Sequence, residues 1–145
     1  IALLVVSAGI AAASLIVLDT HSFIWADSQP SKLGVGARRR IDAASLRGDL
    51  AMSSVMFFET GLLALRNRVK LAQDVRHWRK KLLERGVREL VVDGAIAARA
   101  VEVQLGDPFD RIIVATAIEH DCALITADAE ILAWRGQLKR FDASE

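Results

Sequence analysis

The sequence has little cysteine and almost no net charge, and each shortage excludes a class of protein. Its single cysteine, Cys122, cannot form an internal disulfide or supply a cysteine-rich zinc site. A reducing, cytoplasmic setting is consistent with this cysteine content. A formal net charge of +1 gives no bulk attraction to nucleic acid or to a membrane. Any such binding must therefore come from local patterns of charge.

The first eighteen residues contain no charged side chain. An uncharged segment of this length is long enough for a membrane span to be considered. They contain Ser7, Gly9 and Ser14, however, and no basic segment precedes them as in a signal peptide. Residues 15–18 instead have the pattern of a buried parallel strand that leads into a polar turn. We expect a domain over residues 14–145, preceded by an apolar extension over residues 1–13, and we do not expect a membrane protein.

Short apolar runs alternate with helical patterns along the rest of the chain. Strands are predicted over residues 15–18, 49–52, 89–92, 122–126 and 138–141. Helices are predicted over residues 21–26, 30–46 (with Ser31 as N-cap), 53–66, 74–85, 94–104, 107–120 and 128–134. Strands separated by helices imply a parallel sheet that is covered on both faces. The predicted fold is a three-layer α/β/α arrangement around a central, mainly parallel sheet of four to five strands.

Acidic residues recur where the predicted strands end. Asp19 directly follows the first strand, and Asp128 lies two residues beyond the fourth. Glu59 is in the early turns of the helix after the second strand, and Asp110 is in the first turn of the helix before the fourth. Ligands of parallel sheets bind beyond the carboxyl ends of the strands, and neighbouring carboxylates repel one another unless a cation lies among them. Oxygen ligands without histidine or cysteine favour Mg²⁺ or Mn²⁺.

The segment around Asp110 also has a purely structural interpretation. Asp107 suits the N-cap of a helix, and Pro108 suits its first position. Asp110 would then interact favourably with the positive end of the helix dipole. For this segment alone, the capping interpretation and the metal-site interpretation both stay open.

Four segments together resemble the PIN-domain nucleases, and among them the VapC-type toxins of bacterial toxin–antitoxin pairs. The matching segments are residues 16–21, 53–71, 107–117 and 124–128. By position in these segments, the resemblance implies that Asp19, Glu59, Asp110 and Asp128 are catalytic metal ligands. It also implies an additional metal-binding acid at Asp107 and a hydroxyl near the site at Thr126.

The resemblance further implies an activity and partners. The expected activity is divalent-metal-dependent endonucleolytic cleavage of RNA, and the expected assembly is a homodimer inhibited by a cognate antitoxin. One alternative is a PIN nuclease of RNA processing or DNA metabolism that has no antitoxin. Another is a non-catalytic magnesium-binding α/β module such as a receiver domain, although the paired early acids and the later strand-end lysine of that class are not found.

Two surface features have alternative explanations. Residues 66–88 contain nine lysines and arginines against two acids, and Arg38, Arg39 and Arg40 form a second basic cluster. These clusters could contact RNA phosphates or could be ordinary solvated helix faces. Trp78 is expected to pack rather than to stack a base. A further set of side chains could belong to the core or to a groove for a partner helix: Phe57, Phe58, Leu62 and Leu63.

Overall fold

The computed structural model describes residues 15–145, so the predicted boundary at residue 14 and the extension before it lie outside the described residues. Its centre is a five-stranded sheet in which every pair of neighbouring strands is parallel. The strands are β1 (Ile16–Leu18), β2 (Leu50–Ser53), β3 (Arg88–Leu90), β4 (Ala123–Thr126) and β5 (Arg140–Asp142). Their spatial order is β3-β2-β1-β4-β5, so β1 lies in the middle.

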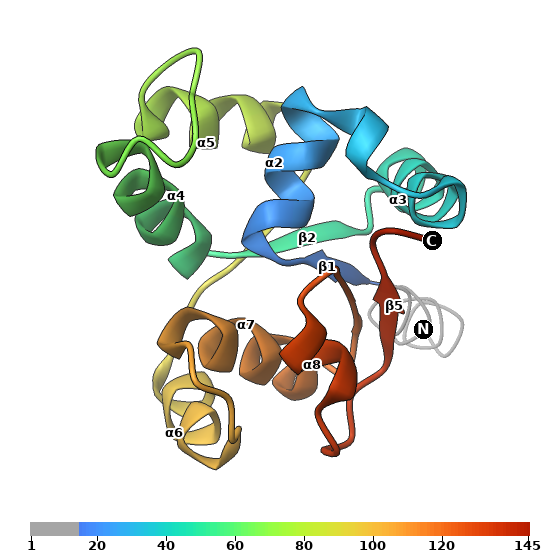
Figure 1. Cartoon of the computed structure of the whole chain (residues 1–145), viewed down its shortest axis with the longest axis vertical. Helices are drawn as coiled ribbons and strands as arrows, with labels where there is room; N and C mark the ends of the chain where they lie inside the picture. Colours follow the sequence, from blue (N-terminus) through green and yellow to red (C-terminus); the bar gives the residue numbers. More distant parts are fainter. Residues whose placement is uncertain (1–14) are drawn as a thin grey trace, which may run out of the picture.

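Helices cover both faces of this sheet (Figure 1). On one side lie α2 (Thr20–Ser28), α3 (Val35–Arg47) and α5 (Val75–Glu84), and on the other lie α6 (Gly94–Glu102), α7 (Pro108–Glu119) and α8 (Ala129–Ala133). Helix α4 (Val55–Leu65) contacts α2 and α5 on the first side and α7 on the second. The predicted three-layer α/β/α fold is therefore confirmed.

Alternation along the strands divides the core into two apolar clusters. Leu18 and Met52 face the first layer, where Phe23, Ile41 and other side chains are buried against them. Neighbouring strand residues point to the opposite face and pack against α6 and α7. The central strands β2 and β4 are buried along their whole length, as expected for a parallel sheet covered on both faces.

The helix predicted over residues 30–46 is wrong at its start. The structure has a 3₁₀ turn, η1 (Pro30–Lys32), then an extended residue at Leu33, and α3 begins only at Val35 with Gly34 as N-cap. Ser31 is therefore not a cap. The cause is a contact from the far end of the chain: Gly34 N–H donates to the carbonyl of Ala143 at 2.9 Å, and a Cβ at Gly34 would lie 2.2 Å from the backbone of Glu145.

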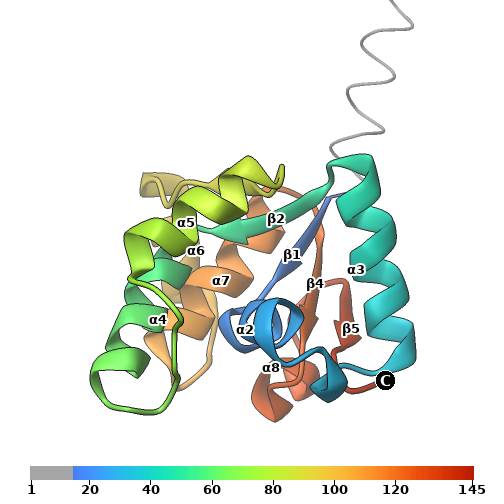
Figure 2. The ribbon, with the colours of Figure 1, turned by 90° about the horizontal axis from the view of Figure 1, so that it is seen from above.

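Because all five strands are parallel, their carboxyl ends lie at one edge of the sheet. Figure 2 shows β1 running toward α2, with α8 at the same end of the sheet. The backbone N–H of Asp19 continues the β1–β4 ladder by donating to the carbonyl of Ile125 at 3.2 Å. Within residues 15–145, no helix has both the length and the apolar character needed to cross a membrane.

Candidate active site

Asp19 is fixed at the end of β1 from two directions. It is the N-cap of α2, and its Oδ1 accepts a hydrogen bond from the backbone N–H of Ser22 at 3.0 Å. Its Oδ2 accepts a hydrogen bond at 2.5 Å from the hydroxyl of Thr126, which lies at the end of the neighbouring strand β4. Asp19 is only 5% exposed, so the orientation of its carboxylate is set by the fold rather than by solvent.

Glu59 reaches the same place from α4. The hydroxyl of Thr20, the first residue of α2, donates a hydrogen bond to Oε1 of Glu59. Asp19 thus supplies one carboxylate of the site. Its neighbour Thr20 holds a second one, Glu59, which lies 39 positions further along the chain. The role of Thr20 was not predicted from the sequence, although a hydroxyl directly after a strand-end acid is a usable signal.

The start of α7 contributes two acids with different local roles. Asp107 caps the helix, because its Oδ1 accepts from the backbone N–H groups of Phe109 at 2.7 Å and Asp110 at 3.2 Å. Asp110 lies in the first turn and makes no cap. The neighbouring Arg111 turns back to the loop, where its Nε donates to the carbonyl of Leu105 at 2.5 Å.

Asp128 repeats the arrangement at the end of β4. It is the N-cap of α8, and its Oδ1 accepts from the backbone N–H groups of Glu130 and Ile131 at 2.9 and 3.0 Å. Its own backbone N–H donates to the hydroxyl of Thr126 at 3.0 Å. Thr126 therefore links Asp19 and Asp128, which agrees with the expectation of a hydroxyl near the site.

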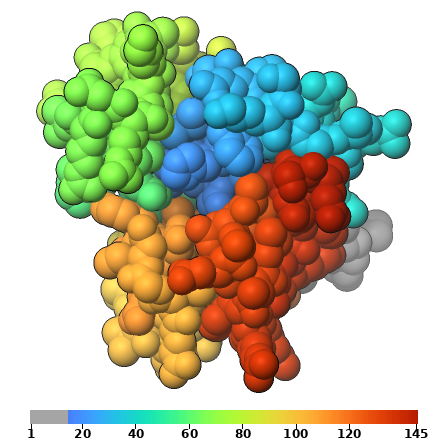
Figure 3. Space-filling view, in the orientation of Figure 1, coloured from blue at the N-terminus to red at the C-terminus, as the bar shows by residue number. Residues whose placement is uncertain are grey.

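These five carboxylates line one cavity of about 230 Å³. The other lining residues are Thr20, His21, Trp25 and Ala127, and no lysine or arginine of the described chain is among them. Figure 3 shows the blue start of the described chain between the green α4–α5 part and the orange-to-red carboxyl-terminal part. Every acid predicted from the sequence is thus brought to this cavity.

Burial and mutual repulsion raise the proton affinity of the buried acids. The pKa of Asp110 is raised from 3.8 to about 8, mainly by burial and then by Asp107, Asp128, Glu59 and Asp19. Burial also raises the pKa of Asp19, against hydrogen bonds from Ser22 and Thr126 that lower it. The pKa of Glu59 is likewise raised mainly by burial and lowered by the bond from Thr20. A cation in the cavity would relieve this repulsion.

The donor set fits a hard divalent cation, since all five acids offer oxygen and no thiol lines the cavity within the described chain. In residues 15–145, however, no three Asp, Glu, His or Cys side chains already surround one point as metal ligands. The carboxylates instead line the walls of the cavity. Among the five acids of the cavity in the described chain, Glu59 and Asp110 are the two that do not act as helix N-caps.

Comparison with known protein families shows which family the chain belongs to. The sequence model of the PIN-domain family matches residues 16–135, which is most of the chain. The chain belongs to the PIN-domain family. Ribonuclease VapC22 of Mycobacterium tuberculosis is 36% identical over 123 residues, covering 83% of this chain and 92% of that relative.

Solved structures agree on the fold of this PIN domain. VapBC2 from Rickettsia felis, bound to a DNA fragment from its promoter, gives a TM-score of 0.66 at 14% identity over 88% of this chain and 98% of that chain. DNA-bound VapBC from Salmonella typhimurium gives a TM-score of 0.64 at 17% identity, over 88% of this chain and 97% of that chain. At such low identities the likeness concerns the fold alone.

The basic residues of the PIN domain divide into two groups. Three members of the predicted cluster are tied to acids: Arg79 to Glu89 at 2.6 Å, Arg85 to Asp27 at 3.0 Å, and Arg88 to Asp49 at 3.7 Å. In the second cluster, the Arg40 guanidinium lies over the ring of Phe141 at 3.6 Å. These arginines therefore have structural partners, whereas residues 67–70 line a cavity together with residues of α2.

Proposed function

We propose that this PIN domain is a divalent-metal-dependent endoribonuclease that acts in the cytoplasm as the toxin of a VapBC-type toxin–antitoxin pair. The observation that carries the proposal is the single cavity lined by Asp19, Glu59, Asp107, Asp110 and Asp128. The 36% identity to Ribonuclease VapC22 over most of both chains supports RNA as the substrate.

The cofactor in this proposal is Mg²⁺, or Mn²⁺ in its place, held by Asp19 and Asp110 as principal ligands. Glu59, Asp107 and Asp128 complete the binding directly or through water. When bound, the cation supplies positive charge that stabilises the phosphoryl oxygens during displacement and makes water a stronger nucleophile. The raised pKa of Asp110 means that metal binding displaces a proton from the site at neutral pH.

The protein groups have positioning roles in the reaction. The hydroxyl of Thr126 holds Asp19, and the hydroxyl of Thr20 holds Glu59, so both carboxylates keep one direction before the substrate arrives. Three of the acids are N-caps, so they are held at the positive ends of helix dipoles. The cavity can thereby gather several acids at one place without a bound basic side chain.

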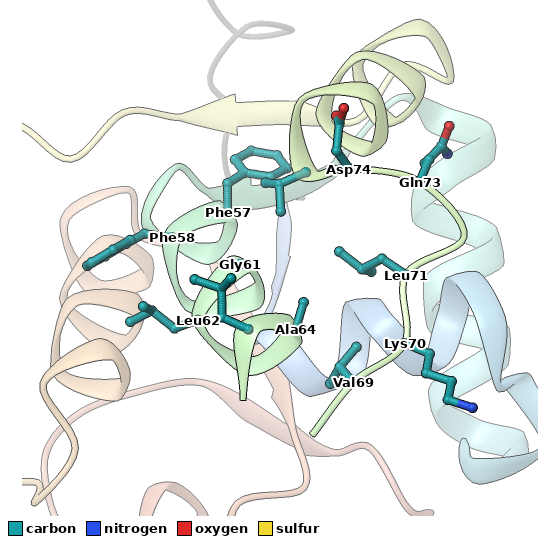
Figure 4. Close-up of a pocket in the computed structure, with 12 residues that line it drawn as sticks. Phe57, Phe58, Gly61, Leu62, Ala64, Val69, Lys70, Leu71, Gln73 and Asp74 are labelled. Carbon is teal, nitrogen blue, oxygen red and sulfur yellow. The ribbon is translucent and has the colours of Figure 1, made fainter. Parts of the chain in front are cut away.

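A cognate antitoxin and a homodimer complete the proposal. The solved relatives named above are VapBC complexes, which supports an antitoxin partner. An apolar cavity of about 710 Å³ between α4, the following loop and α5 gives such a partner a binding surface (Figure 4). Phe58 is 63% exposed there and Leu65 81%. Apolar side chains of a partner segment would cover both. Phe58 is one of the residues for which the sequence had left core and groove open.

Purified protein incubated with RNA and with single-stranded DNA, with and without Mg²⁺, tests the activity. We expect RNA cleavage only with the metal, and Asp19→Asn should abolish it. Undiminished cleavage by Asp19→Asn would refute the metal-site assignment. Preference for DNA would favour a PIN nuclease of DNA metabolism. Mg²⁺ binding without cleavage of either substrate would favour the non-catalytic module. Co-purification with the product of the neighbouring reading frame tests the antitoxin.

A further inference from the structure

A second cavity adjoins the acidic one and has the opposite charge. It has a volume of about 350 Å³ and shares two lining residues, His21 and Trp25, with the acidic cavity. Three cationic side chains line it: Lys32, Arg68 and Lys70. No aspartate or glutamate of the described chain is among its lining residues. We call this cavity the basic groove.

Helix α2 connects the two cavities. Asp19 caps its start, and His21 and Trp25 follow four residues apart, so they lie on the same face one turn after the other. Their rings make an edge contact with centroids 6.4 Å apart. Trp25 is half-buried against the first core cluster, which fixes its ring at the boundary between the acidic cavity and the basic groove.

Two other segments supply the cations. Lys32 comes from η1, and its Nζ lies 5.9 Å from the centroid of the Trp25 ring. Arg68 and Lys70 come from the segment after α4, where Asn67 adopts a left-handed φ of 55° and reverses the chain. Figure 4 shows Val69 and Leu71 turned into the apolar cavity, whereas Lys70 between them, which lines both cavities, has its ammonium end directed outward.

These three cations are available to a ligand. Within residues 15–145, none of Lys32, Arg68 and Lys70 forms an ion pair, in contrast to Arg79, Arg85 and Arg88. The distance from Lys32 to Trp25 is near the outer limit of a cation–π contact, so a ligand can displace that contact at little cost. Unpaired cations beside a partly exposed aromatic side chain are features that recur in single-strand nucleic-acid binding.

We propose that the basic groove binds the single-stranded part of the RNA next to the cleaved phosphate. Trp25 stacks an unpaired base, and Lys32, Arg68 and Lys70 contact the phosphates on that side. Stacking on an aromatic ring requires a base that is free of a helix, so the groove selects unpaired RNA. The proposal rests on the ribonuclease function proposed above, and it assigns to the two cavities separate tasks, one for chemistry and one for holding the strand.

Binding of a short fluorescent single-stranded RNA, measured by anisotropy over a range of salt concentrations, tests the groove. All proteins carry Asp110→Asn so that the RNA is not cleaved. Lys32→Ala with Arg68→Ala should weaken binding about 10-fold or more and reduce the slope of log affinity against log salt by about 1.4, at roughly 0.7 per phosphate contact. Arg38→Ala with Arg39→Ala removes the same charge from the exposed face of α3, and we expect it to leave the slope unchanged.

Trp25→Ala should weaken binding about 10-fold without changing the salt slope, and Trp25→Phe should stay close to the parent. Thermal melting checks that the Trp25 variants fold, and the charge variants test the groove independently of that result. If the parent binds RNA and the groove variants match it in affinity and slope, the groove proposal is overturned while the nuclease proposal stands. If the parent binds no RNA at all, the proposed function itself fails.

Discussion

The acidic cavity and the basic groove meet at His21 and Trp25, yet they are built by different means. Four of the acids, Asp19, Glu59, Asp107 and Asp128, are held by backbone N–H groups or hydroxyls at the ends of strands and the starts of helices. The cations of the groove come from a 3₁₀ turn and a loop, on long side chains without an acidic partner among the described residues. Chemistry needs groups fixed in advance, whereas a phosphate backbone can be followed by adaptable charges.

The structure shows that the two interpretations of the segment around Asp110 are compatible. Asp19, Asp107 and Asp128 each cap a helix, and all three line the acidic cavity. The capping and the site therefore use the same side chains. A cap employs one carboxylate oxygen, Oδ1 in all three, and leaves Oδ2 for other partners. Capping is thus a way of aiming an acid into the cavity.

Replacement of Asp110 should have the largest effect and should affect only the acidic cavity. We expect Asp110→Asn to lower the rate of RNA cleavage about 10³-fold, because the charge of a metal ligand is lost. This corresponds to a rise of about 4 kcal/mol in the activation barrier. Affinity for single-stranded RNA should persist, because the groove is untouched. Cleavage assays and anisotropy on the same preparation separate the two. Retained cleavage would show that Asp110 is not a ligand.

The sequence was informative where local patterns determine structure. The strands, the helix cap at Asp107 and the grouping of the four acids near strand ends follow from short-range signals. The start of α3 does not, because the contact that displaces it comes from Ala143 and Glu145. The basic groove was missed for the same reason: Arg68 is far in sequence from Trp25 and Lys32, and only the packing of the segment after α4 against α2 brings them together.

Trp78 provides the structural counterpart of Trp25. It is 2% exposed, its ring packs edge-on against Phe57, and its Nε1 donates to Asp27 near the end of α2 at 3.1 Å. This confirms the expectation that it packs rather than stacks a base. Trp78→Ala should lower the free energy of unfolding by about 3–5 kcal/mol. Urea denaturation measures this loss, and RNA affinity per folded molecule should not change.

Trp78→Phe is the matched control, since it keeps most of the apolar volume and removes the hydrogen bond to Asp27. It should cost about 1 kcal/mol for the bond in addition to a smaller packing loss. We distinguish Trp78, which packs in the core, from Trp25, which binds RNA. Equal loss of stability from Trp78→Ala and Trp25→Ala would contradict this distinction.

Thr126 tests how far the acidic cavity depends on being fixed in advance. Thr126→Val removes the hydroxyl that donates to Asp19 and accepts from the backbone of Asp128. We expect cleavage to fall by about 10–100-fold and to require more metal, which is typical when the hydrogen bond to a metal ligand is lost. Thr126→Ser keeps the hydroxyl and should recover most of the activity. Rates measured against Mg²⁺ concentration distinguish poor metal binding from general unfolding.

The smallest effect concerns stability and pH. The folded protein keeps a proton on Asp110 up to about pH 8, whereas the unfolded chain releases it near 3.8. The folded state therefore binds more protons between these values, so the stability of the metal-free protein should decrease as pH rises from about 4 to about 8. The raised pKa values of Asp19 and Glu59 act in the same direction.

Melting temperatures in EDTA should fall by a few degrees across this range, and Asp110→Asn should flatten the curve. Mg²⁺ at pH 8 should raise the melting temperature of the parent more than that of the variant, and parallel pH curves for the two proteins would show that repulsion at Asp110 does not control stability.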